Sequence, residues 1–243
     1  MLLLDLLIPA RCAGCGARGA PCCARCAGVW SSVSEVVRVP VAGVARVFAL
    51  ARYRGVARRL LIAYKERGRR DLAASLGRAL AEAVVVLPLR TAVSAGVRNP
   101  VSSGTSATSF AGEAGTASAS RKICLVPAPS RRSAARVRGG PHVERLANAA
   151  ASVLAGWGFE VAVAPALELT GGARDAVGLD RAERVANLAG RLRFREAGRP
   201  PPGFPVVVLD DVITTGATAA ACVRALEGEG IEVAAVLTLL AAG

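Results

Sequence analysis

Two aspartates and three threonines lie close together near the C-terminus, in the stretch VVVLDDVITTGATAAA at residues 206 to 221. The apolar run before Asp210 and Asp211 is typical of a buried strand, which would present both carboxylates at its carboxyl end. Carboxylates in such a place need partners. The vicinal hydroxyls of a ribose, or a bound divalent cation, would provide them.

The residues that follow favour an anion. Thr214, Thr215 and Thr218 carry hydroxyl donors, Gly216 permits close approach, and a helix is expected to begin near Ala217. The first N–H groups of a helix are unpaired and lie at the positive end of its dipole, so they attract phosphate. Carboxylates beside a phosphate cradle fit a ribose 5-phosphate. The alternative interpretation is a capped helix that follows a strand ending in acidic residues.

The second group of chemically active residues is a set of cysteines near the N-terminus. Cys12 and Cys15 form one Cys-x-x-Cys pair, and Cys23 and Cys26 form another after seven intervening residues. Two such pairs can close a tetrahedral zinc site, and four sulfur ligands indicate a structural metal rather than a catalytic one. Cys22 could replace Cys23. The alternative interpretations of these cysteines are a redox pair or thiols buried as apolar residues.

These residues require elements that hold them in place. From 121 onward, apolar runs without two-residue alternation separate segments with helical spacing: strands in KICLVPAPS at 122–130, at 159–164, at 205–209 and from 231, and helices at 142–155, 180–192 and 217–229. This order predicts an α/β fold with a buried parallel sheet and flanking helices. Ligands of such sheets bind at the carboxyl ends of the strands.

The rest of the chain divides into three further segments. We expect a zinc ribbon at 1–35, a hairpin within 36–53 with two helices separated by Gly68 as a connector or hood at 36–87, and a disordered Ser/Thr/Gly/Ala-rich insertion at 88–120. Residues 121–243 would form the core domain. Cys124 and Cys222 are interpreted as buried apolar residues.

Composition narrows the function classes. The chain has 243 residues, 53% of them apolar, and a net charge of +13 that is carried almost entirely by arginine. This charge favours polyanionic ligands, although genome base composition alone can produce it. The apolar N-terminal stretch contains Asp5 and is too short to span a bilayer, which predicts a cytoplasmic protein without a membrane partner.

The stretch VVVLDDVITTGAT resembles the signature of type I phosphoribosyltransferases, which bind 5-phosphoribosyl-1-diphosphate (PRPP). The double Cys-x-x-Cys, YRGVARRLLIAYKERGRRDLAASLGRAL, LVPAPSRRSAARVRGG and GLDRAERVANLAGRL resemble, in the same order, the ComF-like group of that family, named after a competence protein. The likeness covers nearly the whole chain except about 88–120. It implies a twisted parallel sheet with flanking helices, a zinc ribbon, and transfer of a phosphoribosyl group to an unidentified acceptor with release of pyrophosphate.

The resemblance also implies roles for individual residues. Asp210 and Asp211 would bind the ribose hydroxyls, and residues 214–218 the 5-phosphate. Pro127, Ala128 and Pro129 would form the pyrophosphate loop. Arg138 would neutralise the departing pyrophosphate, unless it is an ordinary surface arginine. Mg²⁺ is expected to accompany PRPP, held mainly by the oxygens of the substrate.

Several positions concern the acceptor. His142 and Ala176 stand where the group usually has glutamine, whereas Arg184 and Asn187 match its pattern and would lie on the acceptor side or form a helix-surface pair. Purine-type enzymes of this family carry an acid where this chain has Thr214, which disfavours purine chemistry. Lys65 is interpreted as a solvated helix residue rather than a substrate contact.

A second hypothesis belongs to another class. The charge, and the association of the group with natural competence, would also suit a non-catalytic DNA-uptake factor that binds DNA or DNA-processing proteins. The sequence offers no basic stretch interleaved with aromatic residues, so this remains the alternative.

Overall fold

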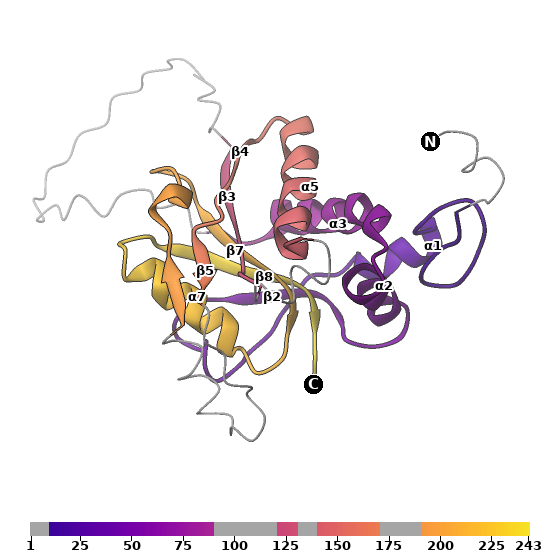
Figure 1. Cartoon of the computed structure of the whole chain (residues 1–243), viewed down its shortest axis with the longest axis horizontal. Coiled ribbons are helices and arrows are strands. Elements are labelled where there is room, and N and C mark those ends of the chain that lie inside the picture. The colour runs from indigo at the N-terminus through magenta and orange to yellow at the C-terminus, as the bar shows by residue number, and fades with distance from the viewer. Residues whose placement is uncertain (1–9, 90–120, 131–139, 171–190) are drawn as a thin grey trace, which may run out of the picture.

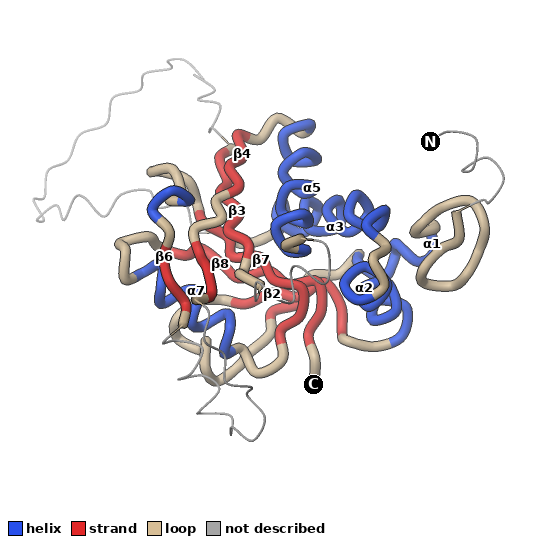
Figure 2. The backbone as a smooth tube through the Cα atoms, in the orientation of Figure 1, coloured by secondary structure: helices blue, strands red, loops and turns tan. Residues whose placement is uncertain are grey.

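The computed structural model describes residues 10–89, 121–130, 140–170 and 191–243 (Figure 1). Its centre is a six-stranded sheet in the order β1-β2-β8-β7-β3-β4 (Figure 2). All neighbours in this sheet are parallel except β1 and β2. The strands are β1 Ser34–Glu35, β2 Val47–Arg52, β3 Lys122–Pro127, β4 Glu160–Val163, β7 Val206–Ile213 and β8 Val233–Ala241. The predicted α/β class with a mostly parallel sheet is confirmed.

Among the described residues, four longer helices flank the sheet, with α7 on one side and the other three on the opposite side (Figure 1). They are α2 Gly55–Glu66, α3 Ala73–Val86, α5 His142–Gly156 and α7 Ala217–Glu227. Short elements complete the fold: α1 Ala24–Ala27, 3₁₀ turns at Gly28–Trp30, Arg70–Leu72 and Glu196–Gly198, and a small antiparallel pair of β5 Leu167–Leu169 with β6 Leu192–Phe194.

The central strand β7 is buried on both faces, which explains its continuous apolar run. Val207 and Leu209 pack into the core formed with α2, α3 and α5, whereas Val206 and Val208 pack into the core formed with α7. Successive side chains of a strand alternate between faces. Residue 211 therefore belongs to the face of α2 and α5, and residue 210 to the face of α7.

The end of β7 differs from the expectation in one respect. The predicted strand 205–209 continues to Ile213, because β8 carries the hydrogen-bonded ladder through Asp210↔Thr238 to Ile213↔Ala241. On the other edge the ladder with β3 stops, with the N–H of Ala128 donating to the carbonyl of Leu209 at 2.8 Å. On the side of β8, the aspartates therefore lie within the paired part of β7. On the side of β3, they lie beyond the last paired residue, at the rim of the sheet.

The segment before residue 87 is integrated with the sheet. The strand β1 pairs with β2 antiparallel, but residues 36–46 between them form no strand, so the predicted hairpin is wider than the sequence indicated. β2 also pairs in parallel with β8, and α3 packs closely on α5. Gly68 separates the two helices, as predicted, with a φ of 67°. Residues 36–87 therefore share one hydrophobic core with the strands that follow 121.

Some expectations fall outside the described residues. These are most of the insertion predicted at 88–120, and residues 180–190 of the helix predicted at 180–192. The end of that helix is wrong, because Leu192 lies in β6 opposite Leu169. Within the described part of the chain, none of the helices is long and apolar enough to cross a membrane.

Candidate functional site

The predicted ligand residues lie at the carboxyl ends of β3 and β7. Pro127, Ala128 and Pro129 line a cavity of about 260 Å³ beyond β3. Asp210 borders a much smaller hollow, of about 30 Å³, formed mainly by residues 212–219 after β7. Adjacent parallel strands place these two loops at the same edge of the sheet. The structure therefore brings the predicted ribose, phosphate and pyrophosphate residues to one end of the sheet.

Asp210 is the aspartate that accompanies the 214–218 loop. Its Oδ1 accepts a hydrogen bond from the backbone N–H of Asp211 at 2.8 Å. Burial, together with the negative charge of Asp211, raises the pKa of Asp210 to about 8. Without a ligand, this carboxyl therefore keeps its proton at neutral pH, and a cation or a set of hydroxyl donors would favour its ionisation.

Asp211 lies on the opposite face of β7 and is held by two side chains. Its Oδ2 is 2.6 Å from Lys65 Nζ of α2 and accepts a hydrogen bond from His142 Nε2 of α5 at 2.7 Å. Burial raises the pKa of Asp211, but the His142 hydrogen bond and the Lys65 charge outweigh burial and hold the pKa below its usual range. Asp211 is therefore a fixed, ionised carboxylate.

The interpretation of Lys65 as a solvated residue is wrong. Its side chain is only 26% exposed, and that of Asp211 is 7% exposed. An ammonium group this close to a buried carboxylate supplies the charge that the carboxylate needs. One weak signal for this pair was present in the sequence: Lys65 and Lys122 are the only lysines in a chain whose basic side chains are otherwise almost all arginine.

His142 connects Asp211 to the β3 loop. Its Nδ1 is 3.4 Å from Ser130 Oγ, and its backbone carbonyl accepts a hydrogen bond from Tyr64 Oη at 2.7 Å. Burial raises the pKa of Tyr64 and keeps its hydroxyl a donor. His142 thus begins α5 in a fixed position between the β3 loop and Asp211 of β7. Its place at an expected glutamine position did not reveal this contact.

The 214–218 loop is shaped by Gly216, which precedes α7 with a φ of 86°. No side chain caps α7, although the N–H of Ala217 donates to Thr215 Oγ1 at 3.3 Å. Arg38 lies against this loop, with its Nε donating to the carbonyl of Thr214 at 2.7 Å. Its Cβ would be 2.8 Å from a Cβ added at Gly216. Arg38 was not singled out from the sequence, because residue 38 and residue 214 are far apart in the chain.

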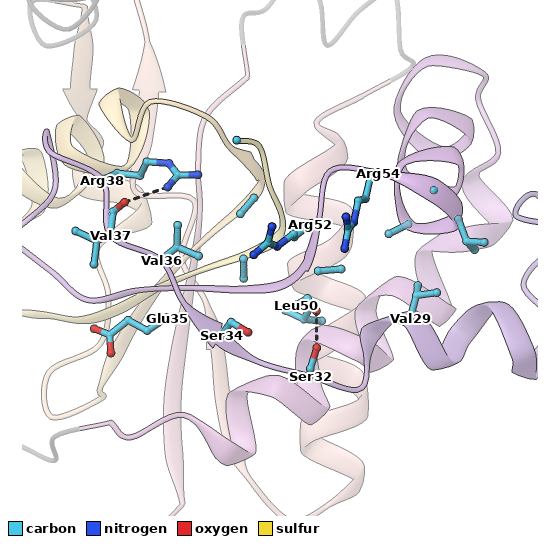
Figure 3. Close-up of a pocket in the computed structure, with 17 residues that line it drawn as sticks. Val29, Ser32, Ser34, Glu35, Val36, Val37, Arg38, Leu50, Arg52 and Arg54 are labelled. Carbon is cyan, nitrogen blue, oxygen red and sulfur yellow. Dashed lines mark hydrogen bonds between the residues drawn. The ribbon is translucent and has the colours of Figure 1, made fainter.

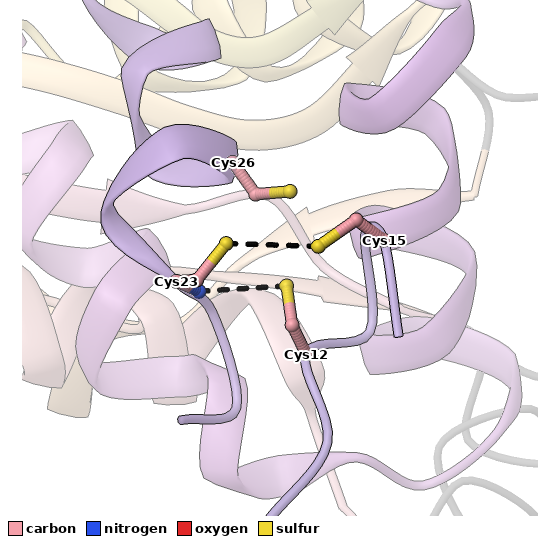
Figure 4. A group of neighbouring side chains, drawn as sticks. All are labelled: Cys12, Cys15, Cys23 and Cys26. Atoms are coloured by element: carbon pink, nitrogen blue, oxygen red, sulfur yellow. Dashed lines mark hydrogen bonds between the residues drawn. The ribbon is translucent and has the colours of Figure 1, made fainter. Parts of the chain in front are cut away.

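The four predicted cysteine ligands form a second site. The Sγ atoms of Cys12, Cys15, Cys23 and Cys26 all lie within 4.8 Å of one another and converge on a common point (Figure 4). Cys15 Sγ and Cys23 Sγ are 3.7 Å apart. A tetrahedral zinc with bonds of about 2.3 Å needs sulfur atoms separated by about 3.8 Å. The cluster is therefore compatible with a structural metal such as zinc.

The geometry distinguishes between Cys22 and Cys23. Cys23 belongs to the converging group, whereas Cys22 Sγ lies 3.9 Å from the carbonyl oxygen of Cys23. Burial raises the pKa of Cys22 to about 11. For Cys12, burial acts in the same direction, but hydrogen bonds from the backbone N–H groups of Cys23, Cys15 and Gly14 outweigh it and lower its pKa to about 6. Cys12 is thus the thiol best prepared to bind a metal as thiolate.

The cysteine cluster is fixed to α2. Arg59 of that helix donates from Nε to the carbonyl of Gly14 at 2.7 Å, and Arg69 donates from its terminal nitrogen to the carbonyl of Arg11 at 3.0 Å. A Cβ at Gly14 would be 2.9 Å from both Cys26 Sγ and Val56, so only glycine allows this packing. The cysteine cluster therefore packs against the helix that carries Lys65.

Three predicted residues, Arg138, Arg184 and Asn187, lie outside the described residues, so their roles stay predictions. Cys124 and Cys222 are fully buried, as predicted.

Comparison with known proteins gives no assignment: no family model matches the chain, and no curated protein matches its sequence. The functional interpretation therefore depends on the motifs and on the geometry of the two sites.

Proposed function

We propose that the protein is a PRPP-binding phosphoribosyltransferase of the ComF-like type, with a structural zinc at its N-terminus. The observation that carries this proposal is the position of Asp210 beside the Gly216 turn that begins α7. A carboxylate and an uncapped helix start at the end of one buried parallel strand fit a sugar hydroxyl and a phosphate at the same time.

Different residues of this chain would bind different parts of PRPP, the phosphoribosyl donor. The N–H groups and hydroxyls of residues 214–218 bind the 5-phosphate, and Asp210 accepts hydrogen bonds from the ribose hydroxyls. Because Asp210 holds a proton near neutral pH, binding in this mode releases that proton. Asp211 lies on the other face of β7 from Asp210 and does not reach the ribose. Bound by Lys65 and His142, it fixes the end of the strand.

Arg38 lies against the phosphate loop, because its Nε donates to the carbonyl of Thr214 at 2.7 Å. Arg38 is also a guanidinium next to the expected phosphate, and guanidinium groups bind phosphate in a bidentate manner. We therefore assign Arg38 as a residue that shifts from the Thr214 carbonyl to the 5-phosphate.

Transfer would break the bond between C1 of the ribose and the pyrophosphate oxygen. The electron pair of that bond leaves with pyrophosphate, and a lone pair of the acceptor forms the new bond to C1, after which the acceptor loses a proton. The residues after β3 and Arg138 would stabilise the charge on the leaving group. Mg²⁺, bound mainly by substrate oxygens, would supply additional neutralisation.

Calorimetric titration with PRPP and Mg²⁺ tests this function. Wild type should bind, and Asp210→Asn should weaken binding about tenfold or more, because an amide is a poorer acceptor for two hydroxyls. Glu227→Gln makes the same carboxyl-to-amide change at the exposed far end of α7 and should bind like wild type. The proposal fails if wild type does not bind PRPP, or if Asp210→Asn binds it as tightly as Glu227→Gln.

A further inference from the structure

A large cavity lies beside the 214–218 loop and is not used by the function proposed above. Its volume is about 690 Å³. It opens at the carboxyl ends of β2 and β8, near Arg52 and Ala241, and is bordered by residues 34–38 and by the first turn of α2 (Figure 3). A cavity of this size at the carboxyl edge of a parallel sheet is a typical small-molecule site.

The charge of this cavity is strongly one-sided. Arg38, from the segment between β1 and β2, and Arg52 and Arg54, from the junction of β2 and α2, line the same side of it in Figure 3. Among the lining residues the only acidic side chain is Glu35, which already binds Arg46 through two hydrogen bonds of 3.0 and 2.7 Å. In the part of the chain that the structure describes, the side chains of Arg52 and Arg54 form no ion pair. Their charges are therefore available to a ligand.

Neutral donors and an apolar wall complete the cavity. Gly55, Val56 and Ala57 of the first turn of α2 line it, and no side chain caps that helix, so N–H groups face the same space as the arginines. Ser32 and Ser34 lie on the opposite side, in the view of Figure 3. The apolar lining is contributed by Val29, Val36, Leu50 and Val56. The cavity thus suits a molecule with acidic groups at one end and an apolar body.

Arg38 connects this cavity to the phosphate loop. Its side chain lines the cavity, donates to the carbonyl of Thr214 at 2.7 Å, and also binds the carbonyl of Ala242 after β8. A ligand in the cavity and a phosphate on the loop would therefore share one wall. This arrangement favours a second reactant over a distant regulatory site.

We propose that this cavity binds an anionic small molecule with at least two acidic groups, carboxylates or phosphates, held by Arg52 and Arg54. The role of this molecule as the acceptor of the phosphoribosyl group rests on the proposed function. The binding of the molecule in the cavity does not rest on it. In that role, the acidic groups would hold the acceptor at the rim of the sheet while its nucleophile is directed past Arg38 toward C1 of the ribose. The acceptor would then be an acid-bearing compound and not a simple neutral nucleobase.

Titration calorimetry with citrate and with inorganic pyrophosphate as probes tests the cavity. Wild type should bind one or both, and Arg52→Ala with Arg54→Ala should weaken that binding by roughly tenfold or more, because two charge-assisted contacts are lost. The matched control is Arg193→Ala with Arg224→Ala, which removes two exposed arginines outside the cavity and should leave binding unchanged. The two probes separate carboxylate from phosphate recognition.

A second set of titrations, with PRPP and Mg²⁺ present, separates this proposal from the first. Citrate should still bind when PRPP is bound, and the Arg52/Arg54 variant should retain wild-type affinity for PRPP. No binding of either probe by wild type, equal losses in both double variants, or displacement of citrate by PRPP would each overturn the anion cavity. If the probes bind but PRPP does not, the cavity stands and the proposed transferase function fails.

Discussion

Asp210 and Asp211 are neighbours in sequence with opposite environments. The side chain of one borders the loop before α7, and the other is bound by Lys65 and His142 on the reverse face of the same strand. The sequence predicts two carboxylates at the end of a buried strand. It does not predict their separation, because the partners of Asp211 come from helices whose docking depends on the whole core. The pattern alone therefore suggested two equivalent carboxylates, whereas the structure has one beside the 214–218 loop and one bound by Lys65 and His142.

Replacing each aspartate in turn by asparagine should distinguish these two roles by the change in the free energy of unfolding. The folded pKa of Asp211 is lowered, so its ionised form stabilises the protein above the unfolded value of about 3.8 and that contribution is lost as pH falls. Asp211→Asn leaves Lys65 without its counter-ion and should reduce the free energy of unfolding by about 2 kcal/mol at pH 7.

For Asp210 the sign is reversed. Its folded pKa is raised to about 8, so the folded state binds the proton more tightly and stability falls as pH rises from about 4 to about 8. Asp210→Asn should be nearly neutral at pH 3, where the folded and unfolded states both hold the proton, and stabilising by several kcal/mol at pH 8. Urea unfolding at both pH values measures this, and destabilisation at pH 8 would refute the assigned environment of Asp210.

Gly216 offers a second test at the scale of single residues. A side chain there meets both a positive φ and the Cβ of Arg38 at 2.8 Å. Gly216→Ala should therefore cost about 2–3 kcal/mol and abolish PRPP binding. Gly230→Ala is the matched control, because its φ of 74° imposes similar strain but no atom lies within 4 Å. Thermal unfolding should show a cost of only ~1 kcal/mol there, with unchanged PRPP affinity.

At the scale of elements, α2 links the two sites. Arg59 binds the Gly14 carbonyl of the cysteine cluster, and Lys65, six residues later, binds Asp211. Helical spacing and the break at Gly68 predicted this helix and α3. The periodicity of a helix shows which face is apolar but not which partner covers it, so the docking of the cluster on α2 was not predictable.

Metal binding should therefore support this helix. Cys15→Ser removes one member of the converging group, whereas Cys22→Ser changes a thiol outside it. The first variant should lose bound zinc and melt about 5–10 °C lower, a cost of roughly 2–3 kcal/mol, because the cluster no longer braces α2. The second should keep one zinc per chain. Elemental analysis and thermal unfolding give both readouts, and zinc loss in the Cys22 variant would contradict the ligand set.

For the whole molecule, alternating apolar runs and helical segments were sufficient to predict a parallel sheet, but not its strand order. β2 joins the sheet beside β8, and β8 in turn extends β7 past the aspartates to Ile213. The first fact depends on contacts between residues about 190 positions apart, such as Phe48 with Leu237, and the second on pairings such as Asp210 with Thr238. The large cavity is built at this junction. A search for motifs within one segment could not find it, since its arginines belong to no single motif.

The charge of the whole molecule also allows a final test of the DNA alternative. With a net charge of +13, the protein should bind a short duplex at 50 mM salt and lose most of that affinity by 200 mM, because released counterions drive the binding. The Arg52/Arg54 and Arg193/Arg224 double variants each remove two positive charges, so non-specific binding should weaken equally in both. Fluorescence anisotropy over a salt series measures this. Affinity that persists at 200 mM salt would show recognition beyond phosphate charge, and the alternative of a nucleic-acid-handling factor would then be preferred.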